Sequence, residues 1–116
     1  MFYYFSLVPA SEIEISGNTT TPDEQETFII ECRVVANPPA TFEWSRDNEV
    51  LNDSRISITN QFTSTDEPTS TSILTIRNIT VNDGGDYVCT AENDVSLSPI
   101  SAYFTVNVTG EVHVLF

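Results

Sequence analysis

Hydrophobic and polar residues alternate along four stretches of this chain, at 27–34, 41–45, 71–78 and 101–108. A period of two is the pattern of a β-strand that buries one face. The inward positions that it predicts are Phe28, Ile30, Cys32, Val34, Phe42, Trp44, Leu74, Ile76, Ala102, Phe104, Val106 and Val108. Turn-forming residues separate the stretches, and no helical period is visible. The pattern predicts an all-β domain made of two packed antiparallel sheets.

The opening segment, 1–10, is expected to be a first strand. Val8 and Ala10 have the small-residue spacing of a signal-peptidase site, but the apolar run before them is short and no Lys or Arg precedes it. No stretch is long and apolar enough for a membrane span, so we expect no membrane insertion within this chain and any anchor to lie outside it. The length of 116 residues predicts one domain over 1–110, with 111–116 as a C-terminal tail or linker.

Charge narrows the choice of partner. Seventeen Asp and Glu residues face four basic residues, which gives a net charge of −13. Nucleic acid and anionic membranes would be repelled, so neither is an expected partner. The acidic balance serves solubility or favours a basic partner, and it opposes self-association at long range, although salt screens that repulsion over about 8 Å.

A second alternation, in the run DGGDYVC, places Asp83, Gly85, Tyr87 and Cys89 at every second position. Tyr87 and Cys89 therefore point inward, as Cys32 does in its own strand, so a bridge between two sheets is geometrically reasonable. Closing that loop would stabilise the fold by roughly 4 kcal/mol in the chain-entropy model. Trp44 lies on the inner face of the strand that follows Cys32, where it can pack on the bridge.

Together these residues resemble the immunoglobulin superfamily. The residues that carry the resemblance are Cys32, Trp44, Leu74, Asp83, Gly85, Tyr87 and Cys89. It implies an immunoglobulin-like β-sandwich of two antiparallel sheets with one inter-sheet disulfide. It also implies a tyrosine corner at Tyr87, a positive φ at Gly85 and an ion pair between Asp83 and Arg55.

Within the superfamily, the segments NPPATFEW and YVCTAEND resemble the intermediate set (I-set) found in adhesion molecules and receptor ectodomains. About ten residues separate Trp44 from Arg55, too few for the extra strands of a variable domain. Two departures from the family pattern are the acidic DEQE at 23–26, where a glycine is usual, and the long segment 59–70, expected to connect the fourth and fifth strands.

No catalytic arrangement or cofactor site is expected, so the chain is predicted not to be an enzyme. Its one histidine, His113, lies in the tail, and no second ligand stands at zinc spacing from it. Calcium is the more specific alternative, because four carboxylates lie in or shortly after the run DGGDYVC, at Asp83, Asp86, Glu92 and Asp94. Since these alternate between strand faces and do not converge, calcium binding is not expected.

Four glycosylation sequons begin at Asn18, Asn52, Asn78 and Asn107. With the bridge, they favour a secreted or cell-surface chain, as part of a larger protein. On the expected topology, three of them lie at the end where the chain leaves the domain. The opposite end, formed by 37–40 and 93–97, has none.

The resemblance therefore implies an extracellular module that recognises another protein, homophilic or heterophilic. A glycan blocks protein contact, so the partner site is expected at the bare end and the adjoining strand face, with candidates Tyr103, Thr90, Glu92, Asn93, Asp94, Val95 and Leu97. For Tyr103, an ordinary half-buried strand position is the alternative. Two rival functions are an intracellular structural domain of the giant muscle-protein kind and a soluble ligand-binding or carbohydrate-binding domain. Arg33 and Arg77 are expected on the sheet opposite Tyr103, which weakens the sugar-binding alternative.

Overall fold

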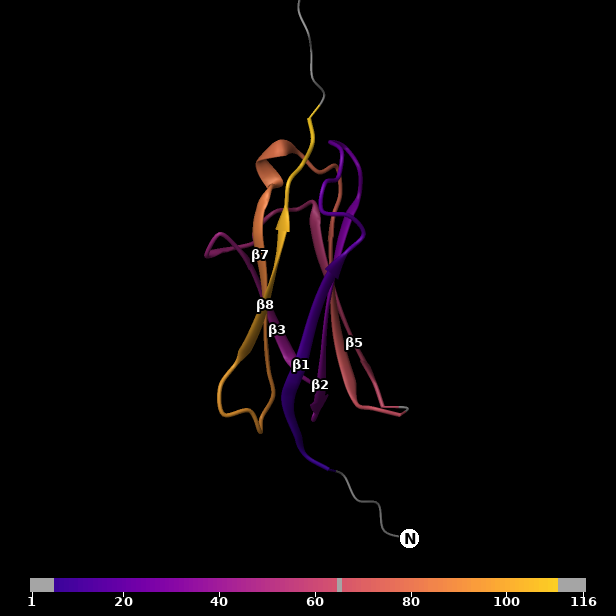
Figure 1. The fold of residues 1–116 in the computed structure, drawn as a ribbon, viewed down its shortest axis with the longest axis vertical. Coiled ribbons are helices and arrows are strands. Elements are labelled where there is room, and N and C mark those ends of the chain that lie inside the picture. Colours follow the sequence, from indigo (N-terminus) through magenta and orange to yellow (C-terminus); the bar gives the residue numbers. More distant parts are fainter. Residues whose placement is uncertain (1–5, 65, 111–116) are drawn as a thin grey trace, which may run out of the picture.

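The computed structural model describes residues 6–64 and 66–110, which form a β-sandwich (Figure 1). Two antiparallel sheets of four strands each face one another, in the orders β1-β2-β6-β5 and β4-β3-β7-β8. The strands are β1 Val8–Gly17, β2 Phe28–Asn37, β3 Thr41–Arg46, β4 Glu49–Val50, β5 Ile56–Thr63, β6 Thr69–Ile76, β7 Gly85–Glu92 and β8 Ile100–Val106, and a short 3-10 helix, η1 Val81–Asp83, precedes β7. The predicted all-β sandwich is confirmed.

The core lies where the two-residue period predicts it. Phe28, Ile30 and Cys32 on β2 and Leu74 and Ile76 on β6 are fully buried between the sheets. The residues between them on each strand are more exposed. Each large side chain buried in this way stabilises the fold by about 1.5–3 kcal/mol relative to exposure, so the alternation fixes which face of each strand turns inward.

The disulfide joins the two sheets as expected. Cys32 on β2 and Cys89 on β7 are bonded, with a sequence separation of 57 and both residues fully buried. Trp44 lies cross-strand from Cys89 and shares its core cluster. The indole Nε1 donates a hydrogen bond of 2.8 Å to Ser72 Oγ. The alternation Ser70, Ser72, Leu74, Ile76 does place Ser72 inward, but only packing against Trp44 gives its hydroxyl a role.

The first strand differs from the expected 1–10. It is β1, Val8–Gly17, and of the expected segment only Val8 to Ala10 belong to it, while residues 1–5 lie outside the described part. The missed signal is a weak alternation in which Ile13 and Ile15 pack against the core between exposed glutamates. Two register shifts interrupt the pairing of β1 with β2.

The segment 59–70 is mostly strand, which corrects the expected long connection. β5 and β6 pair without a break over eight positions, from Ile56 with Ile76 to Thr63 with Thr69, so the connection covers only 64–68. A polar strand at the edge of a sheet has the same composition as a loop, which explains the error. The short span after Trp44 also holds one extra strand, the two-residue β4, which pairs with β3.

The acidic segment 23–26 forms a turn in which Gln25 has φ 72°, a conformation that glycine favours. Its backbone N–H donates to Ile79 O at 2.8 Å, and Ile79 N–H donates to Glu26 O at 3.0 Å. The turn is therefore held by main-chain hydrogen bonds to the segment before η1, and no glycine is needed.

Candidate functional site

The end of the sandwich from which the chain leaves, called the exit end here, comprises 18–26, 77–84 and 107–110 (Figure 1). A buried carboxylate organises it. Asp83, 5% exposed, accepts hydrogen bonds of 2.9 and 2.8 Å from the Arg55 guanidinium and one of 2.7 Å from the Thr80 backbone N–H. The predicted Asp83–Arg55 pair is confirmed, and it ties the start of β5 to η1.

Competing effects act on the pKa of Asp83. Burial raises the pKa of its carboxyl. The hydrogen bonds from Arg55 and Thr80, together with the positive charge of Arg55, outweigh this effect, so the pKa lies below its usual value. The pKa of Arg55 is raised by its hydrogen bonds to Asp83 and Asp53. Both groups are therefore ionised at neutral pH, and they form a salt bridge with a structural role.

The predicted tyrosine corner at Tyr87 and the predicted positive φ at Gly85 are confirmed as well. The Tyr87 hydroxyl donates a hydrogen bond of 2.5 Å to the Asp83 carbonyl, which makes Tyr87 a tyrosine corner. Burial raises the pKa of this phenol. Gly85 has φ 142°, so its backbone conformation favours glycine. A Cβ atom there would lie 2.6 Å from Oδ2 of the exposed Asp47 side chain, which would have to shift.

The opposite end, called the far end, is formed by 37–40 and 93–97. Asn93, 9% exposed, organises it: its side-chain amide donates to Val8 O at 2.8 Å and to Pro38 O at 2.9 Å, and its Oδ1 accepts from Ser96 Oγ at 2.8 Å. It thus fastens three segments that are distant in the sequence. Asn93 was a candidate for partner contact, and its burial gives it a structural role instead. Turn composition alone gives no signal for this.

The remaining candidates fall into two groups. Asp94 and Leu97 are exposed on the far-end loop, and Val95 beside them is partly exposed. Tyr103 is 71% exposed, so it is not half-buried, but it lies midway along the edge strand β8, cross-strand from Val88. Four residues along β7 separate Val88 from Glu92, the last residue of that strand, which is roughly 13 Å. Tyr103 is therefore on the strand face and away from the loop.

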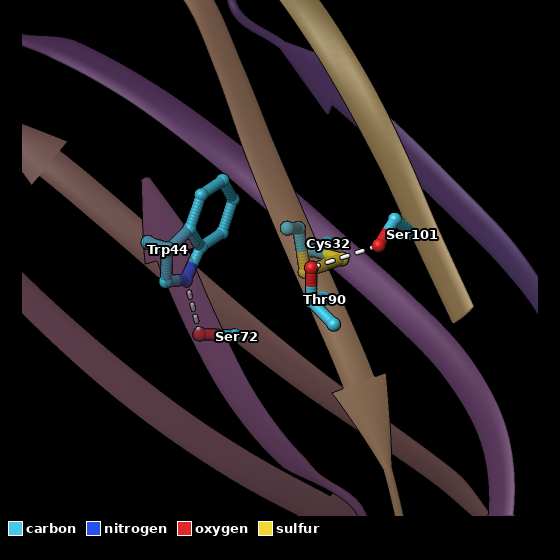
Figure 2. Close-up of a disulfide and its surroundings, with 6 residues drawn as sticks. Cys32, Trp44, Ser72, Thr90 and Ser101 are labelled. Carbon is cyan, nitrogen blue, oxygen red and sulfur yellow. Dashed lines mark hydrogen bonds between the residues drawn. A yellow bond between two sulfur atoms is a disulfide. The ribbon is translucent and has the colours of Figure 1, made fainter. Parts of the chain in front are cut away.

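Thr90 lies between the two groups. Its hydroxyl forms a 2.8 Å hydrogen bond with the hydroxyl of Ser101 on β8, as Figure 2 shows. This bond links the side chains of the two neighbouring strands on the outer face. Thr90 therefore offers a partner less free hydrogen-bonding capacity than its position suggests.

The outer face of the sheet β4-β3-β7-β8 is acidic. Asp47 and Asp86 border an open hollow beside Tyr103 and Val88, and Glu43 and Glu92 are exposed farther along. The four arginines are elsewhere: Arg46 and Arg55 approach Asp83, Arg33 is on β2, and Arg77 follows β6. The expectation that Arg33 and Arg77 lie on the sheet opposite Tyr103 is confirmed. A partner that meets this face encounters carboxylates without matching cations.

The four sequon asparagines are all exposed. Asn18 follows β1, Asn78 follows β6 and Asn107 follows β8, which places these three at the exit end, while Asn52 lies between β4 and β5. The Asn107 backbone N–H donates to Thr20 O at 2.9 Å, so the first and last of these sequons are neighbours. The positions are accessible to a glycan, and their occupancy stays a prediction.

The four carboxylates considered for calcium do not gather at one point. Asp83 is buried against Arg55, whereas Asp86 accepts a 2.6 Å hydrogen bond from Thr105 on the outer face. Over the described ranges, no group of three His, Cys, Asp or Glu side chains is placed to hold a metal ion. Those ranges also contain no helix of the length and hydropathy that crossing a membrane requires. His113 lies outside them.

The family model for the immunoglobulin domain matches residues 12–93 of this chain. Tyrosine-protein kinase-like otk of Drosophila melanogaster is 30% identical over 107 residues, 92% of this chain and 9% of that protein. Fasciclin-2 of Schistocerca americana is 36% identical over 83 residues, 68% of this chain and 8% of that protein. Smooth-muscle myosin light chain kinase of Gallus gallus is 35% identical over 68 residues, 59% of this chain and 3% of that protein.

Among solved structures, the D1-D2 fragment of Rst superposes with a TM-score of 0.72 at 25% identity, covering 89% of this chain and 51% of that one. The chain belongs to the immunoglobulin-domain family. It spans less than a tenth of the length of the curated relatives named above, so the kinase names describe much longer proteins. The domain fold that they share with this chain is typically non-catalytic.

Proposed function

We propose that this chain is an extracellular, non-enzymatic module that binds another protein through the outer face of β7 and β8 and the adjoining far-end loop. Family membership and the matches to Fasciclin-2 and otk support the choice of a recognition module. The buried disulfide and the four exposed sequon asparagines support an extracellular location. The single observation that carries the choice of surface is the uncovered Tyr103, 71% exposed, since aromatic anchors dominate many interfaces.

The partner's charge follows from the acidic face. Asp47 and Asp86 border the hollow beside Tyr103, and Glu43 and Glu92 are exposed farther along the same face, without arginine neighbours. The proposed partner therefore presents Lys or Arg side chains. Rim charges of this kind mainly raise the association rate, so the association rate constant is expected to fall as salt is added. This makes a second copy, which is equally acidic, a poor occupant of this face.

A new glycan on the far-end loop tests the proposal. Asp94→Asn creates the sequon Asn-Val-Ser without touching the buried Asn93, and Asp94→Gln removes the same carboxylate without a sequon. The tetramerised domain, made in a secreting host, is screened against an array of recombinant cell-surface ectodomains. Binding lost in the glycosylated Asp94→Asn protein and kept in Asp94→Gln supports the far end as part of the contact. Undiminished binding by the glycosylated variant would rule it out.

The match to a smooth-muscle kinase supports one rival function, an intracellular structural domain. The two readings differ in the state of the cysteines, because an intracellular domain would keep Cys32 and Cys89 reduced. A thiol assay on protein taken from its native host separates them. One bridge per chain and no free thiol supports the extracellular function, whereas two free thiols would support the muscle-type function.

A further inference from the structure

The edges of the two sheets are not equally protected. A sheet edge presents unpaired N–H and C=O groups, and proteins usually protect it with short strands, bulges, charges or a covering segment. Among the described residues, β4 has only two residues, β1 carries two register shifts, and β8 is in contact with β1. β5 has none of these protections: it is eight residues long, pairs regularly with β6, and is free on its other side (Figure 1).

Charge is also missing from this edge. The segment 56–65 contains no charged residue, although the chain as a whole carries −13. It also contains no proline or glycine. Two large apolar side chains on it are uncovered, Ile58 at 47% and Phe62 at 40% exposure. They sit cross-strand from the buried Leu74 and Ser70, so both lie on the inner face of the sheet, on its edge strand.

The order of residues along β5 makes it complementary to itself. Asn60 is midway between Ile58 and Phe62. If two copies of β5 lie antiparallel with a two-fold axis at Asn60, Ile58 of each copy faces Phe62 of the other, and the two Asn60 amides face each other. Thr59 then faces Gln61, and Ser57 faces Thr63, so residues 57–63 pair with one another within β5. Pairs of an aromatic and a β-branched residue are among the stabilising cross-strand pairs, and facing amides can hydrogen-bond.

From this geometry we infer that the free edge of β5 is a docking site for the β5 edge of a second copy of this chain, with the two-fold axis at Asn60. The two sheets β1-β2-β6-β5 then join into one continuous sheet across the dimer. The neutral strand brings no like charges into contact, and salt screens the repulsion between the remaining carboxylates. The contact lies on a different sheet from Tyr103, and it does not rest on the proposed function.

Charge reversal at the axis tests both the partner and the register. Asn60 is exposed, so Asn60→Lys and Asn60→Asp are expected to fold, which circular dichroism checks. Each variant alone places two like charges opposite each other and is expected to weaken the dimer at least tenfold in sedimentation-equilibrium experiments. An equimolar mixture of the two is expected to restore a dimer containing one of each. Ser16→Lys, on the opposite edge strand of the same sheet, adds the same charge and is expected to leave the dimer unchanged.

The dimer of the parent protein is expected to strengthen between low and high salt, because the net charges repel. The inference is overturned if the parent protein stays monomeric at concentrations up to about 1 mM, because a dissociation constant above this value would correspond to less than about 4 kcal/mol of binding free energy. It is also overturned if the separate Asn60 variants dimerise as well as the parent, or if Ser16→Lys weakens the dimer as much as they do. A parent monomer that binds an extended peptide through β5 would point to a different occupant of the edge.

Discussion

The two ends of the sandwich are each organised by one buried polar side chain. The two residues differ in charge and in whether the sequence alone predicts their role. Asp83 at the exit end is ionised and neutralised by Arg55, whereas Asn93 at the far end is neutral and bonds to main-chain carbonyls. Both join segments that are distant in the sequence. The exit end is further surrounded by three sequons, while beside Asn93 the loop leaves Asp94 and Leu97 uncovered. Similar anchoring therefore leaves exposed sequon asparagines around one end and an exposed loop without a sequon at the other.

The disulfide lies between the two ends, so breaking it should loosen both. The variant Cys32→Ala with Cys89→Ala is expected to lose about 4 kcal/mol of unfolding free energy, because the closed loop no longer restricts the unfolded chain. Urea denaturation followed by Trp44 fluorescence measures this loss. A midpoint within a few tenths of a molar of the parent would show that the bridge is not structural.

Asp83→Asn should break the exit end alone. It leaves Arg55, whose side chain is 29% exposed, without its buried partner, and we expect a loss of about 2–3 kcal/mol, below the range for fully buried pairs. The loss should depend on pH. Since the pKa of Asp83 is lower in the folded than in the unfolded chain, its carboxylate stabilises the fold fully above the unfolded pKa of about 3.9. That contribution disappears as the pH falls through the lowered folded pKa.

Urea midpoints of the parent and of Asp83→Asn at neutral pH and at about pH 2 therefore give a large and a small difference, respectively. The other carboxylates titrate in both proteins, so their effect on stability largely cancels in the comparison. A difference of equal size at the two pH values would mean that the ion pair does not stabilise this end.

Asn93→Ala should break the far end alone. It removes the hydrogen bonds to the partly buried carbonyls of Val8 and Pro38 and is expected to cost about 2 kcal/mol, with the same loss at neutral and acidic pH. Asp94→Ala, at the next and exposed position, is the matched control and should change stability by less than about 0.5 kcal/mol. Equal effects of the two substitutions would show that Asn93 does not fasten this end.

Tyr87→Phe tests the comparison between the two ends with the removal of a single hydroxyl group at the exit end. It removes only the hydroxyl that donates to the Asp83 carbonyl and is expected to cost about 1 kcal/mol. Amide hydrogen exchange should rise at η1 and the start of β7 and stay unchanged at 93–97. A parent-like denaturation midpoint would place this hydroxyl in contact with solvent.

Sequence patterns predicted the features that depend on local alternation or on a fixed family motif. The inward faces of β2 and β6, the bridge, the Asp83–Arg55 pair and the positive φ of Gly85 belong to this group. The structural role of Asn93 could not be predicted, because its partners lie 85 and 55 residues away in the sequence. The second half of β5 was mistaken for loop because an edge strand need not alternate. The first strand was expected too early in the chain, at 1–10, because register shifts interrupt the period of β1.

The central claim is that recognition uses a surface that contributes little to stability, and Tyr103→Ala tests it most directly. The side chain is 71% exposed, so its removal should change the unfolding free energy by less than about 0.5 kcal/mol. Binding to a partner identified on the ectodomain array should fall at least tenfold, which surface plasmon resonance measures with both proteins at physiological salt. Unchanged affinity with unchanged stability would contradict the claim, since the outer face of β7 and β8 would then not be the contact surface.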